Sequence, residues 1–136
     1  MKYYNYEMRK REIDALLQKY FNDDFGAVIT FDLNNNVDVI EICKLTKEGN
    51  ATTWTHYANV CNMDTSKNNN WEINEQYIKI DEDFCKRWGD EYRVYIGTEQ
   101  TAMNIYGYFK TLGGAIRNLA KNGTSENGRK PITIYV

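Results

Sequence analysis

The sequence predicts an α+β fold: a mostly antiparallel sheet of about five to six strands, with an N-terminal helix, a short middle helix and a long C-terminal helix packed mainly on one face. Two observations support this. Apolar residues recur at helical spacing near both ends of the chain, and several β-rich segments lie between them without regular βαβ alternation. The 136 residues hold no internal repeat and no long linker, so residues 1–136 are expected to form a single domain.

The first helix is expected over residues 6–22. Charged residues occupy most of one face, and apolar residues recur on the other at i, i+3, i+4, i+7 and i+8, which is the pattern of an amphipathic helix. The apolar positions are Ile13, Leu16, Leu17, Tyr20 and Phe21. The Asn22-Asp23-Asp24 cluster ahead of Gly26 predicts the end of the helix.

Four β-segments follow. The strands 27–33 and 37–43 flank Asn34-Asn35-Asn36, and because Asn tolerates the positive φ of tight turns they predict an antiparallel hairpin. A third strand is expected over 52–61 and a fourth over 76–80. In the third strand, simple alternation places four residues on one face, namely Trp54, His56, Ala58 and Val60. The other face then holds Thr53, Thr55, Tyr57 and Asn59.

The last part of the chain predicts two helices and two strands. Asp81 is a suitable N-cap for a short helix through Trp88, and a strand is expected over 91–96. A long helix should run from its cap at Thr98 to Gly123, because apolar residues keep helical spacing between them. A short strand over 132–136 ends the chain.

Charge and composition restrict the classes of function. The net charge of −2 is too small for a nucleic-acid mimic and does not suit a general nucleic-acid binder. The charge is uneven, since six basic and two acidic residues from Arg93 onwards give this part a net charge of +4. Tyr, Asn, Lys and Ile all have AT-rich codons, which suggests an AT-rich genome such as that of a low-GC bacterium or its phage.

The expected location is the cytoplasm. No apolar run is long enough for a signal peptide or a membrane span, so we expect no membrane contact. Three cysteines, Cys43, Cys61 and Cys85, cannot all pair within one chain. In a reducing compartment they are expected to be free thiols.

Metal and cofactor binding are not expected. Cys43, His56, Cys61 and Cys85 have the right chemistry for zinc, but no Cys-x-x-Cys or His-x-x-x-His spacing joins them. Alternation also places His56 and Cys61 on opposite faces of one strand. No glycine-rich phosphate-binding motif is present.

The aromatic surplus favours a protein that works by binding. Eleven Tyr cannot all be core in so small a domain, and exposed Tyr and Trp are enriched in interfaces. We therefore predict a small non-enzymatic protein-binding module, of the kind that phages and mobile elements encode to inhibit host defence systems, such as anti-CRISPR proteins. The predicted contact residues combine aromatic groups with carboxylates that would attract a basic partner, such as a nucleic-acid-binding protein. They are Tyr57, Trp71, Asp81, Glu82, Asp83, Trp88 and Tyr92.

Two alternatives remain open. One is a nucleic-acid or nucleotide binder that uses the basic C-terminal third, with contact residues Arg117, Lys121, Arg129 and Lys130. The other is an enzyme in which His56, the single histidine, works with a nearby cysteine. A homodimer is also open, because the strand 132–136 could lie at a sheet edge and pair with a second copy.

Overall fold

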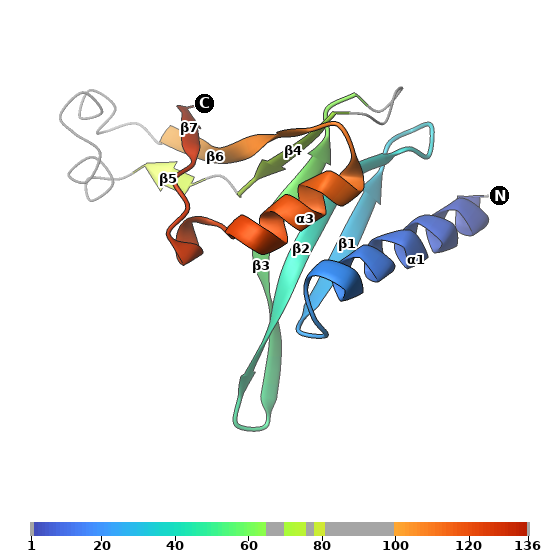
Figure 1. The fold of residues 1–136 in the computed structure, drawn as a ribbon, viewed down its shortest axis with the longest axis horizontal. Coiled ribbons are helices and arrows are strands. Elements are labelled where there is room, and N and C mark those ends of the chain that lie inside the picture. Colours follow the sequence, from blue (N-terminus) through green and yellow to red (C-terminus); the bar gives the residue numbers. More distant parts are fainter. Residues whose placement is uncertain (1, 65–69, 76–77, 81–99, 136) are drawn as a thin grey trace.

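A computed structural model describes residues 2–64, 70–75, 78–80 and 100–135 (Figure 1). They form two α-helices, one short 3-10 helix and the strands of one sheet. The elements in chain order are α1 (Lys2–Tyr20), β1 (Phe25–Phe31), β2 (Val37–Glu48), β3 (Ala51–Asn62), β4 (Trp71–Asn74), β5 (Ile78–Ile80), β6 (Gln100–Phe109), α3 (Leu112–Asn122), η2 (Ser125–Asn127) and β7 (Ile132–Tyr135).

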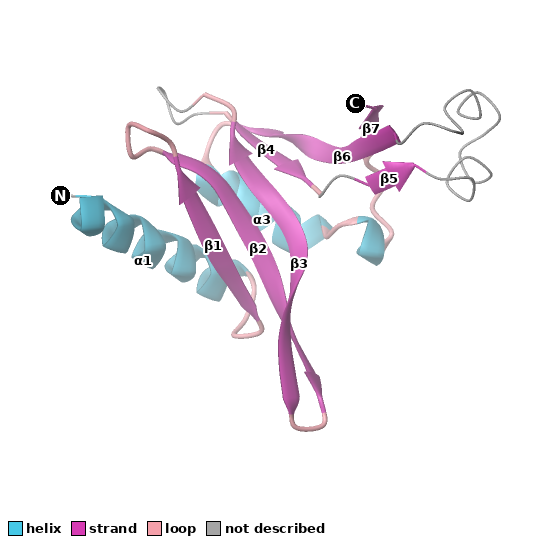
Figure 2. Cartoon of the chain, turned by 180° about the vertical axis from the view of Figure 1, so that it is seen from behind, coloured by secondary structure: helices cyan, strands magenta, loops and turns pink. Residues whose placement is uncertain are grey.

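All strand pairs of the sheet are antiparallel. Its order is β1-β2-β3-β4-β6-β5, and β7 also pairs with β6. β4 and β5 pair with successive parts of β6, because Asn74 lies opposite Ile105 and Ile78 opposite Ala102. Viewed from behind, the sheet leaves one face free of the two described helices, while both helices lie on the other face (Figure 2).

The core lies between the sheet and the two helices. Ile13 and Leu17 of α1 contact it from one side, as the amphipathic pattern predicts, and α1 itself begins and ends earlier than expected. α3 contributes three buried residues, and the sheet contributes the inward-facing residues of β2, β3 and β4. The buried apolar residues of these elements are Val37, Ile40, Ile42, Ala58, Val60, Trp71, Ile73, Ala115, Ile116 and Leu119.

The first hairpin confirms the predicted antiparallel pair. β1 and β2 are joined at Asn34-Asn35-Asn36, and Asn35 has a φ of 63°. The Asp32 carboxylate accepts hydrogen bonds from the backbone N–H groups of Asn34 and Asn36. The turn therefore uses the positive-φ tolerance of Asn together with a side chain that satisfies its backbone donors.

The predicted faces of β3 are wrong before Ala58. The pairing with β2 shifts between Ile42 and Cys43, so that Ala58 lies opposite Ile42 and His56 opposite Cys43. Tyr57 is left without a partner residue, which is a β-bulge. The bulge moves His56 to the face opposite Ala58 and puts Tyr57 on the same side as Ala58.

The predicted long C-terminal helix is wrong. Residues 100–109 form the strand β6, and the helix that follows has only 11 residues. The misleading spacing arises from a second bulge at Tyr106, because Ile73 pairs with Gly107 and Asn74 with Ile105. With Tyr106 inserted, Tyr106 and Phe109 both pack against the core although they are three residues apart. That spacing resembles the repeat of a helix.

α3 begins beside a glycine pair, Gly113-Gly114, which the predicted helix over 98–123 would have placed in its interior. Thr111 is the N-cap, and its side-chain oxygen accepts a hydrogen bond from the Gly114 N–H at 3.0 Å. Gly113 and Gly114 therefore lie in the first turn, not in the interior. The predicted middle helix over 81–88 and the strand over 91–96 lie outside the described residues.

Candidate protein-binding surface

β1 is an edge strand of the described sheet. Among the described strands β1 pairs with β2 alone. The Leu45 N–H donates to the Asp24 carbonyl, and the Asp32 N–H donates to the Asn36 carbonyl, so even-numbered residues direct their backbone groups toward β2. In an antiparallel strand these directions alternate. Ala27 and Ile29 therefore direct an N–H and a C=O each toward the edge.

The sequence of β1 lacks the charged residues and proline that normally keep an edge strand from pairing with other chains. Its seven residues, FGAVITF, contain no charged residue and no proline. Natural edge strands are normally guarded by charges, proline or bulges, because an unguarded row of backbone groups pairs with other chains. The apolar, unguarded edge is therefore a surface suited to contact with another polypeptide.

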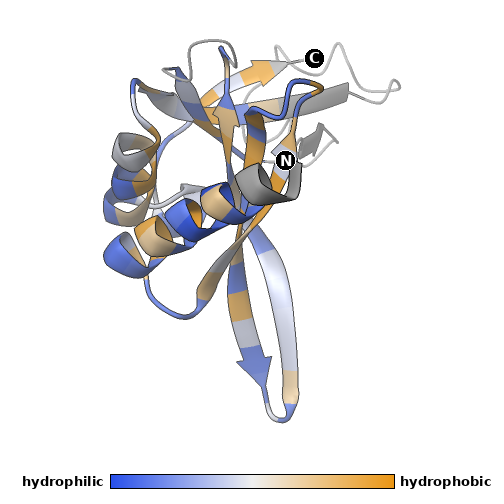
Figure 3. Ribbon diagram, turned by 90° about the vertical axis from the view of Figure 1, so that its right-hand side faces the viewer, coloured by the Kyte–Doolittle hydropathy of each residue, from blue (hydrophilic) through white to orange (hydrophobic). Residues whose placement is uncertain are grey.

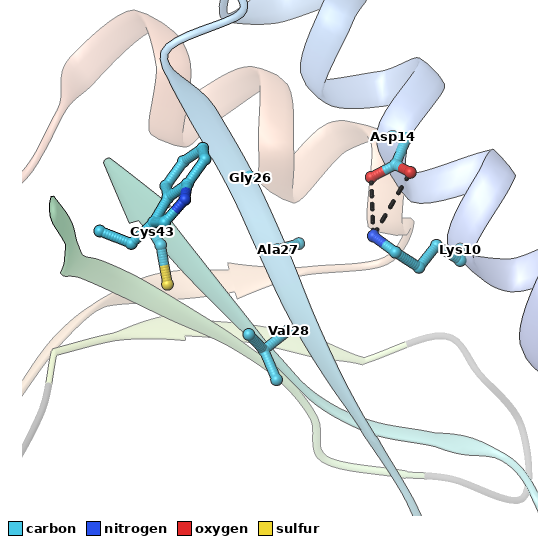
Figure 4. A pocket seen from close by; sticks show the side chains of 7 residues that line it. Lys10, Asp14, Gly26, Ala27, Val28 and Cys43 are labelled. Carbon is cyan, nitrogen blue, oxygen red and sulfur yellow. Dashed lines mark hydrogen bonds and ion pairs between the residues drawn. The ribbon is translucent and has the colours of Figure 1, made fainter. Parts of the chain in front are cut away.

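A groove of about 350 Å³ lies along this edge. We call it the edge groove and define it by its lining residues, which come from α1, β1, β2 and β3: Lys10, Asp14, Gly26, Ala27, Val28, Cys43 and Trp54. Lys10 and Asp14 lie on one side of the β1 ribbon, and Cys43 lies on the other (Figure 4). The Lys10 ammonium and the Asp14 carboxylate are 3.3 Å apart and both partly exposed, so they form a weak pair.

Two exposed apolar side chains form the other wall of the edge groove. Trp54 is 53% exposed and Val28 is 58% exposed. The Trp54 ring lies over Gly26, because a Cβ built at Gly26 would be 3.3 Å from two ring carbons. Gly26 thus lets the indole lie close to the strand backbone. A large aromatic group half in water and held over a strand has the properties of an interface anchor.

Trp54 lies at the base of a projecting arm. The β2–β3 hairpin continues beyond the last rung that it shares with β1, where Phe25 pairs with Lys44, and Trp54 pairs with Leu45 just outside it. The arm is visible in Figure 1, and its tip is hydrophilic (Figure 3). An isolated two-stranded ribbon is only marginally stable by itself. The arm adds accessible surface beside the edge groove and does not add to the hydrophobic core.

The helix-free face of the sheet carries a polar network. The His56 Nε2 lies 2.9 Å from Asn59 Oδ1, and the Asn59 amide donates to Asn74 Oδ1. The Asn74 amide in turn donates to the Glu72 carboxylate at 2.7 Å and to the Cys61 sulfur at 3.3 Å. Glu72 and Asn74 are buried, and these bonds satisfy their polar atoms.

The contacts of this network suit a structural role better than nucleophilic catalysis. The β3 bulge brings His56 and Cys61 to one face, contrary to prediction, but the described contacts join each of them to an asparagine and not to the other. Burial, and then the charge of Glu41, raise the pKa of Cys43, and burial is the main cause that raises the pKa of Cys61. A thiol with a raised pKa is a poor nucleophile at neutral pH.

No metal cluster is formed by the described residues. They contain no group of three or more His, Cys, Asp or Glu side chains that could hold an ion. Cys43 and Cys61 are free thiols on neighbouring strands, and Cys85 lies outside the described residues. No helix within the described ranges has both the length and the apolar character that a membrane span requires.

A second network fixes the C-terminal loop to the sheet. The Glu75 carboxylate accepts hydrogen bonds from the hydroxyls of Tyr106 and Ser125 and from the amide of Asn104. Burial alone would raise the pKa of Glu75, but these donors outweigh it and lower the pKa. Burial and the bond to Glu75 raise the pKa of Tyr106 to about 12.

The predicted nucleic-acid contacts are divided between this network and the surface. The Arg129 guanidinium lies over the Tyr106 ring and donates to the Gly123 carbonyl and to Asn118 Oδ1, so it is engaged within the fold. Arg117, Lys121 and Lys130 are exposed. The structure thus leaves three of the four predicted basic side chains accessible.

The structure describes two of the predicted protein-contact residues, Tyr57 and Trp71, and both pack within the fold. Tyr57 packs edge-on against Phe21 and Phe25, and its hydroxyl donates to Asn127. Trp71 is 1% exposed and belongs to the core. The others, Asp81, Glu82, Asp83, Trp88 and Tyr92, lie outside the described residues, so their binding role stays a prediction.

No family model, no curated protein and no solved structure matches this chain. Its function therefore has to be argued from its own geometry. Val28 and Trp54 were not among the predicted contact residues, although one signal was present: β1 contains no charged residue. That signal becomes meaningful only when the strand order places β1 at an edge.

Proposed function

We propose that this chain is a non-enzymatic protein-binding module and that the edge groove is its contact surface. The observation that carries the proposal is the unguarded β1 edge, flanked by the exposed Trp54 and Val28. Exposed backbone groups, an aromatic anchor and a nearby charge pair are the elements of peptide and protein recognition. The same region contains no described arrangement suited to catalysis.

Replacing Trp54 by Ala is expected to weaken capture of the partner by about 2 kcal/mol, the scale of an interface hot spot. Immobilised protein would be incubated with a lysate of the cells that carry this sequence, and the bound proteins would be quantified by mass spectrometry. Leu33→Ala is the matched control, since Leu33 is fully exposed in the β1–β2 turn, away from the edge groove. Equal capture by the wild type and both variants would overturn the edge groove as the contact surface.

The identity of the partner is a finer proposal. An anti-CRISPR-like role in a phage or mobile element, and a cytoplasmic location, are supported by composition and by the free thiols alone. The proteins lost from the Trp54→Ala capture test this role. Recovery of a nuclease or another defence component supports it, and recovery of an unrelated enzyme argues against it.

A nucleic-acid binder is the second candidate, and one observation favours it. Arg117 and Lys121 are exposed one turn apart on α3. Charge reversal of both residues is expected to abolish binding that falls steeply with salt. Retained nucleic-acid binding in this double variant, or binding insensitive to salt, would exclude the candidate.

A further inference from the structure

We infer that the edge groove takes an extended peptide segment of the partner as an added strand on β1. The segment has alternating side chains, apolar on the Trp54 side and polar on the α1 side. This inference rests on the proposed function and specifies how the partner is held and which peptide chemistry the groove selects.

The backbone of β1 supplies the first part of the recognition. Ala27 and Ile29 together direct two N–H and two C=O groups to the free side of the strand. An extended segment laid beside β1 pairs with these four groups through its own main chain, as in strand addition to other exposed sheet edges. Main-chain pairing contributes affinity whatever the sequence of the bound peptide segment, which we call the guest.

The two walls of the edge groove supply selectivity. A guest residue opposite Val28 points its side chain to the same face as Val28, where Cys43 and Trp54 also line the groove. Gly26, with no side chain, lets the Trp54 ring lie close to the backbone of β1, and the exposed part of the ring offers an apolar contact to a guest side chain. The guest is therefore selected for apolar residues at every second position on this face.

The opposite wall selects for polarity. Guest residues opposite Ala27 and Ile29 direct their side chains to the α1 face, where Lys10 and Asp14 line the edge groove. Because these two are a weak, partly exposed pair, each can exchange its partner for a guest group of opposite charge. A slip of one residue would place charged side chains against Trp54, so the alternation also fixes the register.

A second copy of the chain fits this groove less well. Its own β1 carries α1 on the same face, so two helices would compete for the space beside the edge where Lys10 and Asp14 lie. A lone extended segment brings no helix. The proposed occupant of the edge groove is therefore a peptide segment of a different protein. The experiment below also detects self-association.

The probe is a displayed library of random twelve-residue peptides, selected on the purified full chain. Selected peptides are expected to alternate apolar and polar residues and to lose at least about tenfold in affinity for Trp54→Ala. Ala27→Pro removes one edge N–H without touching the β1–β2 ladder and should weaken binding by about tenfold, whereas Ala27→Gly, which keeps the N–H, should not.

N-methylation of the peptide backbone keeps the test independent of how the variants fold. In an added strand only every second amide donates to β1, so N-methyl groups should abolish binding at alternate positions and leave the intervening ones unaffected. No enrichment of peptides, or sensitivity without this period of two, overturns strand addition. Self-association that the peptides do not displace overturns it in favour of a dimer. If Trp54-dependent capture persists in either case, the protein-binding function stands without this mode.

Discussion

Trp71→Ala is expected to destabilise the chain by about 3–5 kcal/mol. Trp71 lies in β4, is 1% exposed, and is the largest fully buried side chain of the described core. Removing the indole leaves a cavity between the sheet and the helices that the surrounding residues fill only in part. Because small domains are stable by only about 5–15 kcal/mol, this loss would take a large share of the total.

Urea denaturation followed by circular dichroism measures this effect, and Trp54→Ala is the matched control. Trp54 is 53% exposed, so its removal should cost less than about 1 kcal/mol of unfolding free energy. The two tryptophans therefore separate stability from binding: Trp71→Ala should lose both, and Trp54→Ala only binding. Equal destabilisation by the two variants would show that Trp54 is a packed residue and would remove the basis of the edge groove.

The first half of the fold could be predicted because its signals are local. The apolar stripe through Ile13 and Leu17 and the Asn turn between β1 and β2 each depend on residues close in sequence. The errors in β3 and β6 share one physical cause. A β-bulge inserts one residue, so two inward side chains become three residues apart, and this happens at Tyr57 in β3 and at Tyr106 in β6. Inward side chains that would be two residues apart in a regular strand are then three apart, and that distance resembles the repeat of a helix.

The candidate site could not be predicted because it depends on strand order. Val28 and Trp54 are unremarkable in sequence, and only the strand order shows that they flank a free edge. The edge groove forms only because β1 is first in the sheet order and Gly26 admits the Trp54 ring. Trp71 shows the converse case: its residue type suggests an interface, but the pairing of β4 between β3 and β6 places it in the core.

Glu75→Gln is expected to destabilise the chain by about 1–3 kcal/mol at neutral pH, because one carboxylate joins β6 to the C-terminal loop. Its Oε1 accepts from Tyr106 and Ser125, and its Oε2 accepts from the Asn104 amide. A glutamine would present an NH₂ group to one of these donors. The bond to Asn104 would be restored only if the Asn104 amide turned over and the Thr133 hydroxyl, which now donates to Asn104 Oδ1, became an acceptor.

The effect should depend on pH in one direction. The pKa of Glu75 in the folded chain lies below its ordinary value of 4.5, because donors outweigh burial, so the unfolded chain binds the proton more tightly. The stability that this carboxylate contributes is complete above pH 4.5 and is lost as the pH falls through the folded pKa. The difference in unfolding free energy between wild type and Glu75→Gln should therefore be constant near neutrality and shrink in acid.

Denaturation at a series of pH values from neutral to acid measures this difference, and Tyr106→Phe provides the second arm of a double-mutant cycle. Tyr106 and Glu75 share a hydrogen bond, so the double variant should lose less stability than the two single variants added together, by about 0.5–3 kcal/mol. Additive losses would mean that the two groups act separately. A wild type–Glu75→Gln difference that grows in acid would contradict the lowered pKa, and with it the account of Glu75 as the charged acceptor that holds η2 against β6.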